Sequence, residues 1–234
     1  MKNLRFLITA GTAVVCLWGA KARGDYIANF RAPPYVLDAS VIGVDGWEYR
    51  FPSRANRPLA PYEARVVALR WDDEKPGLRL QGASLKRTSF GTLSSEKVQI
   101  SFRLAVNFAD AAPRRNKALR VIFWPETFGE IFFDDSMKGG LGYQGDGLGK
   151  PGQGTIVLPR AEIKTRSFYT FTLLLDFGKQ TYDVAVTGVK KDGSPFAYKA
   201  DGVEFSPSKA PVNKIETLLL LGTGYFDAFS VESR

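Results

Sequence analysis

The chain has 234 residues, including 32 Lys and Arg, 24 Asp and Glu, one cysteine and no histidine. The lack of histidine excludes Ser-His and Cys-His nucleophilic sites, histidine general bases and histidine-ligated zinc. The formal net charge of +8 is mild, and its densest basic cluster, residues 114–117, is typical of a solvated loop, so the charge does not indicate a nucleic-acid-binding protein.

The first 22 residues have the pattern of an export signal. Lys2 and Arg5 form a short positive region, residues 6–18 are almost entirely apolar, and Ala20-Lys21-Ala22 supplies the small-x-small pattern that a signal peptidase cuts. The apolar stretch is shorter than the roughly 20 residues of a transmembrane helix. We therefore predict a signal peptide over residues 1–22 and a secreted or periplasmic mature protein without a membrane anchor.

Residues 23–234 are predicted to form one domain. Cys16, the only cysteine, lies inside the predicted signal, so the mature chain is expected to have no thiol and no disulfide. A chain of this length can bury a core without covalent cross-links. The sequence also shows no internal repeat and no linker long enough to divide this region.

Alternation of apolar and polar residues with a period of two dominates from residue 60 onward. In residues 97–108, the apolar side chains from Val98 to Phe108 share one face and polar side chains share the other. Strands with one apolar face and one solvent-exposed face predict two stacked antiparallel sheets. Strands are expected at residues 64–71, 77–81, 97–108, 119–124, 129–135, 155–158, 168–177, 181–188, 216–221 and 225–232.

A glycine-rich segment, residues 139–154, interrupts this alternation. Glycine weakens strands and loses more conformational entropy on folding than other residues, so the segment is predicted to be a long loop. We expect this loop to fold over one sheet face, and long loops in compact domains are often functional.

Three further segments carry a family resemblance. They are Val41-Ile42-Gly43-Val44-Asp45-Gly46-Trp47, the hairpin-like residues 173–188, and the closing residues 224–231. Together they resemble the laminin-G-like and concanavalin A-like jelly rolls of exported bacterial proteins, over most of the mature chain. The resemblance implies an all-β, two-sheet antiparallel jelly-roll sandwich. It implies no single activity, because this fold hosts lectins, glycan-binding modules, glucanases, lyases and adhesion domains.

One sheet face is the candidate binding surface. In residues 119–124 and 129–135, alternation places an arginine, a tryptophan and two acids opposite apolar side chains. A sugar offers an apolar C–H face and a hydroxyl rim, so an aromatic ring beside hydrogen-bonding side chains is typical of a glycan site. The alternatives are a strand buried on both sides and acids that are only solvated. The predicted ligand-binding residues are Arg120, Trp124, Glu130, Asp134 and, in the glycine-rich segment, Tyr143.

The acids of this face do not fit standard glycosidase chemistry. Glucanases of the resembling fold carry three acids on one strand, whereas the middle position here is Phe132. Glu130 and Asp134 are separated by about 13 Å along a strand, whereas paired glycosidase carboxyl groups lie about 5 to 9.5 Å apart. The resemblance implies that lyases of this fold place a histidine near a catalytic tyrosine. This chain has no histidine, so Tyr143 could be catalytic only in a lyase that works without one.

Two further interpretations follow from position in the chain. Trp47 follows a glycine turn and is expected to be buried, as in the resembling domains. Asp25 and Asp227 lie near termini that this fold brings together, where jelly rolls often hold a structural calcium through acids and carbonyl oxygens. No spacing signature accompanies these acids, so no cofactor is predicted and calcium is kept as an alternative.

These features predict an exported, non-catalytic β-sandwich that binds a glycan or a cell-envelope polymer, with a polysaccharide or glycoconjugate as partner. One alternative is a glycoside hydrolase or polysaccharide lyase of the same fold, and a second is a structural adhesion or assembly module. No catalytic residue is assigned.

Overall fold

The structure, a computed structural model, describes residues 26–50, 63–88, 96–107, 119–124, 130–134, 138–144, 154–205 and 213–234. The strands in these residues pair antiparallel throughout. No helix in the described part of the chain is long and apolar enough to span a bilayer. The strands are β1 (Tyr26–Ala28), β2 (Trp47–Tyr49), β3 (Glu63–Leu69), β4 (Lys75–Thr88), β5 (Lys97–Ala105), β6 (Leu119–Trp124), β7 (Glu130–Phe133), β8 (Gly140–Gln144), β9 (Thr155–Pro159), β10 (Tyr169–Asp176), β11 (Thr181–Val189), β12 (Pro195–Glu204) and β13 (Thr217–Ser233).

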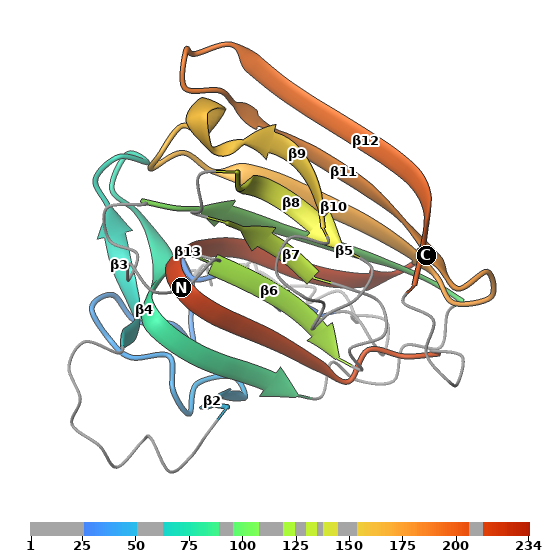
Figure 1. The fold of residues 1–234 in the computed structure, drawn as a ribbon. Coiled ribbons are helices and arrows are strands. Elements are labelled where there is room, and N and C mark those ends of the chain that lie inside the picture. The colour runs from blue at the N-terminus through green and yellow to red at the C-terminus, as the bar shows by residue number, and fades with distance from the viewer. Residues whose placement is uncertain are drawn as a thin grey trace, which may run out of the picture.

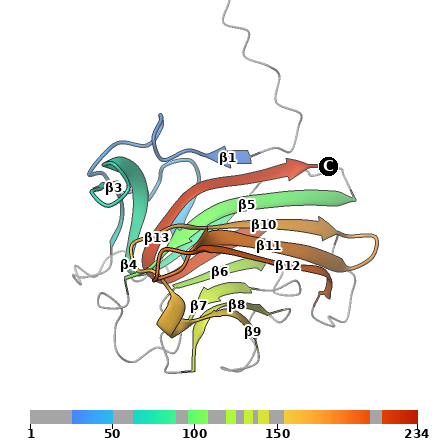
Figure 2. The same ribbon diagram turned by 90° about the horizontal axis from the view of Figure 1, so that it is seen from above.

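The strands form two layers that face each other (Figure 1, Figure 2). The β5 layer has the order β12-β11-β10-β5 and ends at the C-terminal half of β13, beside which β1 lies. The β6 layer has the order β9-β8-β7-β6 and ends at the N-terminal half of β13. Strand β4 pairs with β13 and carries β2 and β3 on its other side. Figure 2 shows the two layers edge-on.

Strand β13 belongs to both layers because it bends at a bulge. Residues 217–222 pair with β6, and residues 225–233 pair with β5. Between them, the register with β4 shifts between Gly222 and Gly224. Gly222 has a φ of 109°, and Gly82 of β4 has a φ of 57°, values that glycine adopts without the steric cost of a side chain. The bend therefore carries β13 from one layer into the other.

The core lies between the layers and is built largely from aromatic rings. Phe102 of β5 stacks on Phe171 of β10, with 5.2 Å between the ring centroids, and meets Phe123 of β6 across the core at 6.1 Å. Phe133 of β7 and Tyr169 of β10 make a second contact between the layers at 5.9 Å. Burial of these rings supplies much of the hydrophobic stabilisation of the sandwich.

The alternation in the sequence predicted this architecture. Along β5, buried residues alternate with half-buried ones from Val98 to Leu104. Trp47 is fully buried, as expected, and its indole N–H donates to the Tyr35 hydroxyl at 3.0 Å. The predicted all-β sandwich of two antiparallel sheets is confirmed.

The prediction of a loop over residues 139–154 is wrong at its start. Gly140–Gln144 forms β8, which pairs with β7 and β9. Glycine fits position 142 of this strand, and position 154 directly before β9, because the Phe132 ring of β7 occupies the space that a side chain would fill. A Cβ at Gly142 would lie 2.8 Å from this ring, and a Cβ at Gly154 would lie 2.6 Å from it. Most of the remaining segment lies outside the described residues.

Two other strand predictions need correction. The strands expected at residues 216–221 and 225–232 are the two halves of the single strand β13, because the bulge bends the strand without ending it. Strand β12 was not expected. It lies at the edge of the β5 layer, and most of its side chains are exposed or half-buried, so its apolar alternation is weak.

Candidate functional site

Backbone register brings several predicted ligand-binding residues onto the outer face of the β6 layer. Arg120 faces away from the core, because Leu119 and Val121 on either side of it are fully buried in the core. Trp124 and Glu130 follow the same alternation in the paired strands β6 and β7, but their side chains lie outside the described part of the structure. Their role in ligand binding stays a prediction.

The centre of this outer face is not open. Ile122 is fully buried and Phe132 is 2% exposed, although neither belongs to the core between the layers. Asp134, directly after β7, is 9% exposed, and its backbone N–H donates to the Gly140 carbonyl at 2.8 Å. The alternative of a strand buried on both sides therefore holds at the centre of this face, where side chains of β6 and β7 are buried on both sides.

Tyr143 lies on the opposite side of the β6 layer. It belongs to β8, is buried in the core, and its hydroxyl lies 3.0 Å from the hydroxyl of Tyr198. Its ring packs edge-on against Tyr182, with centroids 6.3 Å apart. The hydrogen bond with Tyr143, together with burial, raises the pKa of Tyr198 to about 12. The structure therefore places Tyr143 between the layers and not beside Arg120, contrary to the prediction of a loop residue over the binding face.

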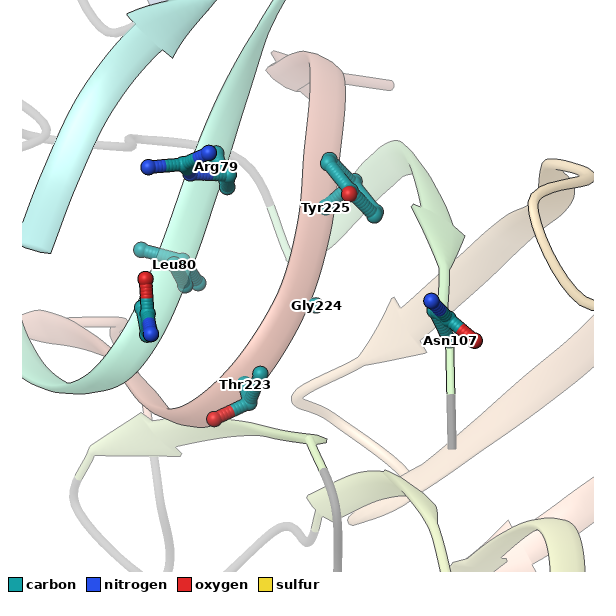
Figure 3. A pocket seen from close by; sticks show the side chains of 7 residues that line it. Arg79, Leu80, Asn107, Thr223, Gly224 and Tyr225 are labelled. Carbon is teal, nitrogen blue, oxygen red and sulfur yellow. The ribbon is translucent and has the colours of Figure 1, made fainter. Parts of the chain in front are cut away.

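A cavity of about 180 Å³ lies where β13 bends, and we call it the bend pocket. It opens where β4 and β13 shift register, and there the hydroxyl of Thr223 accepts a hydrogen bond from the backbone N–H of Gly82 at 2.9 Å. Figure 3 shows side chains from β4, from β13 and from Asn107, just after β5, around it. The residues that line it are Arg79, Leu80, Gln81, Asn107, Thr223, Gly224 and Tyr225.

The described lining of the bend pocket combines one aromatic ring with polar side chains. Gln81 and Asn107 carry amides that both donate and accept hydrogen bonds, and Arg79 carries guanidinium donors. The Thr223 hydroxyl accepts from the backbone, so its own proton remains for donation. These side chains and the Tyr225 ring are half-buried. The pocket is therefore suited to a small ligand that has an apolar face and several hydroxyl groups.

Three aromatic rings form a platform beside the bend pocket. Trp71, in the turn between β3 and β4, meets Tyr225 with centroids 5.2 Å apart and meets Phe168, directly before β10, with centroids 5.0 Å apart. All three rings are half-buried. We call these three residues the aromatic platform, and Tyr225 belongs to both the platform and the pocket.

Arg103 of β5 contacts the platform and the acids beside it. Its guanidinium carbon lies 4.1 Å from the centroid of the Phe168 ring, and its Nη2 atom lies 3.1 Å from a carboxylate oxygen of Asp72 and 3.1 Å from one of Asp227. Arg31 approaches the same Asp227 oxygen at 2.7 Å. Burial raises the pKa of the Asp227 carboxyl, and the guanidinium groups of Arg103 and Arg31 oppose that rise.

Asp227 was also one of the two acids considered for a structural calcium. Asp25, the other, lies outside the described residues. Within the described ranges, no group of three His, Cys, Asp or Glu side chains is placed to hold a metal ion. The calcium stays a prediction.

Sequence reasoning missed the bend pocket and the platform. The pocket residues come from β4, from β13 and from Asn107 just after β5, which are far apart in the chain. Gly222-Thr223-Gly224 inside an alternating segment was an available signal for a bulge. The sequence did not show that β4 and the end of β5 would lie on either side of that bulge.

Several solved structures are similar to this chain in fold. A sialidase aligns with 91% of this chain at 13% identity and a TM-score of 0.52, and this chain spans 19% of that sialidase. A β-glucanase catalytic domain from Podospora anserina aligns with 76% of this chain and 82% of its own, at 15% identity and a TM-score of 0.46. Peanut lectin aligns with 89% of this chain and 97% of its own, at 9% identity and a TM-score of 0.45.

These likenesses concern the fold alone, since the identities are low. No protein-family model matches the chain, and no curated protein sequence matches it. The predicted concanavalin A-like jelly-roll fold is confirmed.

Proposed function

We propose that the mature protein is an exported, non-catalytic protein that binds a glycan or cell-envelope polymer, and that the bend pocket is its binding site. The observation that carries this proposal is the half-buried Tyr225 ring beside four polar side chains in a small cavity. The C–H face of a sugar packs on an aromatic ring, and its hydroxyl groups exchange hydrogen bonds with amides, hydroxyls and guanidinium groups.

The size and chemistry of the pocket support a sugar as ligand. Its volume of about 180 Å³ is smaller than the roughly 300 Å³ at which sites for drug-sized ligands begin, so it suits a single sugar unit more than a large cofactor. A non-catalytic role is supported by the described lining, which contains no pair of carboxyl groups of the kind that glycosidases use.

Export is supported by the positive, apolar and small-x-small segments of the first 22 residues. N-terminal sequencing of exported material is expected to begin at Arg23. Retention of Met1 in that material would contradict this part of the proposal.

A glycan array combined with an assay for new reducing ends tests the binding function. We expect array binding without release of product, and a Kd about tenfold higher for Tyr225→Ala, because a stacking contact of roughly 1 to 1.5 kcal/mol is lost. Tyr49→Ala, which removes a half-buried tyrosine of β2, is the matched control and should leave binding unchanged.

The other outcomes of this experiment identify the alternatives. If Trp124→Ala abolishes binding and Tyr225→Ala does not, the site is the outer face of the β6 layer that carries Arg120, Glu130 and Asp134. Release of product, and its loss in Glu130→Gln, would identify an enzyme. If the protein neither binds the array nor releases product, the adhesion or assembly module is the better hypothesis.

A further inference from the structure

We infer that the aromatic platform is a second sugar-binding subsite that continues from the bend pocket, so that the site takes an oligosaccharide chain and not a single sugar. This inference rests on the proposed function, because it assigns a larger ligand to the same site. It also assigns Arg103 as the residue that positions the platform.

The platform is continuous with the pocket through a shared residue. Tyr225 lines the cavity and contacts Trp71, whose ring lies at 73° to it. Trp71 in turn contacts Phe168. A chain that leaves the pocket past Tyr225 therefore meets two more aromatic rings in succession. Each half-buried ring has surface left to pack against the C–H face of a sugar.

The turn that carries Trp71 is held in place by its backbone. The N–H of Asp72 donates to the Leu69 carbonyl at 2.8 Å, and the N–H of Lys75 donates to the Asp72 carbonyl at 3.0 Å. The side chain of Asp72, the next residue after Trp71, is bound by Arg103. Ordering of the turn before binding lowers the conformational entropy that is lost when a ligand packs on Trp71.

Arg103 links all three parts of the platform. Its guanidinium stacks on Phe168, pairs with Asp72 beside Trp71, and pairs with Asp227 on the strand that carries Tyr225. The guanidinium also compensates the charge of both carboxylates, which suits a surface that binds uncharged hydroxyl-bearing sugars. Arg103 is thus a positioning residue, which acts on the ligand through the aromatic rings.

Chain-length dependence of binding tests the second subsite. The probes are the mono- and hexasaccharides of glucose, mannose, galactose and N-acetylglucosamine, titrated calorimetrically against the mature protein. For the sugar that binds, we expect the hexasaccharide to bind at least about tenfold more tightly than the monosaccharide, since one added stacking contact gives about that factor. Trp71→Ala should remove this preference and leave the monosaccharide affinity unchanged. Trp71→Leu, which keeps an apolar side chain in the turn, should do the same and serves if the alanine variant is unstable.

The positioning role is tested with Arg103→Lys. This variant keeps a positive charge near Asp72 and Asp227 but lacks the planar group that stacks on Phe168, so the hexasaccharide preference should fall severalfold at unchanged monosaccharide affinity. Lys97→Gln is the matched control, because Lys97 lies on β5 and pairs with Asp176 at 3.6 Å, away from the platform. It should leave both affinities unchanged.

The failures of the two proposals are distinguishable. Equal affinity for the mono- and hexasaccharide, or a hexasaccharide preference that survives in both Trp71 variants, would overturn the second subsite while the pocket remains a sugar site. An unchanged preference in Arg103→Lys would overturn the positioning role. Absence of binding by every probe would overturn the proposed function itself and the subsite with it.

Discussion

Trp71→Ala is expected to cost much less stability than Trp47→Ala, because one tryptophan belongs to the platform and the other to the core. Trp47 is fully buried, donates a hydrogen bond to Tyr35 and meets Phe226 with ring centroids 6.5 Å apart. Removal of such a ring from a core costs about 3–5 kcal/mol. The loss also leaves the Tyr35 hydroxyl without its indole donor.

The cost at Trp71 follows from its two ring contacts. Trp71 is half-buried and meets Phe168 and Tyr225 at 5.0 and 5.2 Å. Each aromatic pair is worth about 0.5–1.5 kcal/mol beyond area burial, so loss of the two pairs should lower the free energy of unfolding by about 1–3 kcal/mol. The lost burial of apolar area adds to this, by less than at the fully buried Trp47. Water can enter the space left by a half-buried ring, which keeps the cavity contribution small.

Urea denaturation followed by far-UV circular dichroism measures both costs, and this signal is independent of the tryptophan that is removed. The midpoint should fall in both variants at an unchanged slope m, with the larger fall for Trp47→Ala. If the two variants lose the same free energy, Trp71 is a core residue, and the reasoning that makes it available to a ligand is refuted.

Three further predictions concern the whole domain. Thermal melts of the mature chain with and without reductant should superimpose, and a shift would mean that Cys16 is retained in it. Burial raises the pKa of Tyr35 from 10.0 to about 12. The neutral Tyr35 hydroxyl therefore contributes fully to stability below about pH 10, and this contribution is lost as the pH rises toward 12. A urea midpoint that stays constant from about pH 10 to 12 would contradict this. In Gly188→Ala, the new Cβ would lie 2.4 Å from the buried Tyr169 ring, and the crowding should cost about 1–3 kcal/mol. Gly178→Ala, whose nearest neighbour would be 3.4 Å away, should stay within about 0.5 kcal/mol of the wild type in the same denaturation experiment.

The amino-acid sequence by itself determined the class of fold. The alternation that runs through β5, β10 and β11 fixes which side chains face the core, because successive side chains of a strand point to opposite faces. Burial of Trp47 was expected from the resemblance of residues 41–47 to jelly-roll domains, and it is confirmed. These features depend on near neighbours in the chain, so they can be deduced without knowledge of strand order.

Only the tertiary structure decided which segments lie beside one another. Glycines 140 and 142 predicted a loop on local propensity, but both belong to a strand whose neighbours fill the space of a side chain. The Leu158 carbonyl lies there at Gly140, and the Phe132 ring lies there at Gly142. Tyr143 consequently faces the core, and the face expected to carry it has a buried centre. The bend pocket arises because β4, β5 and β13 meet at one bulge. Pairing between strands distant in sequence sets these neighbours, and local propensity contains no information about it.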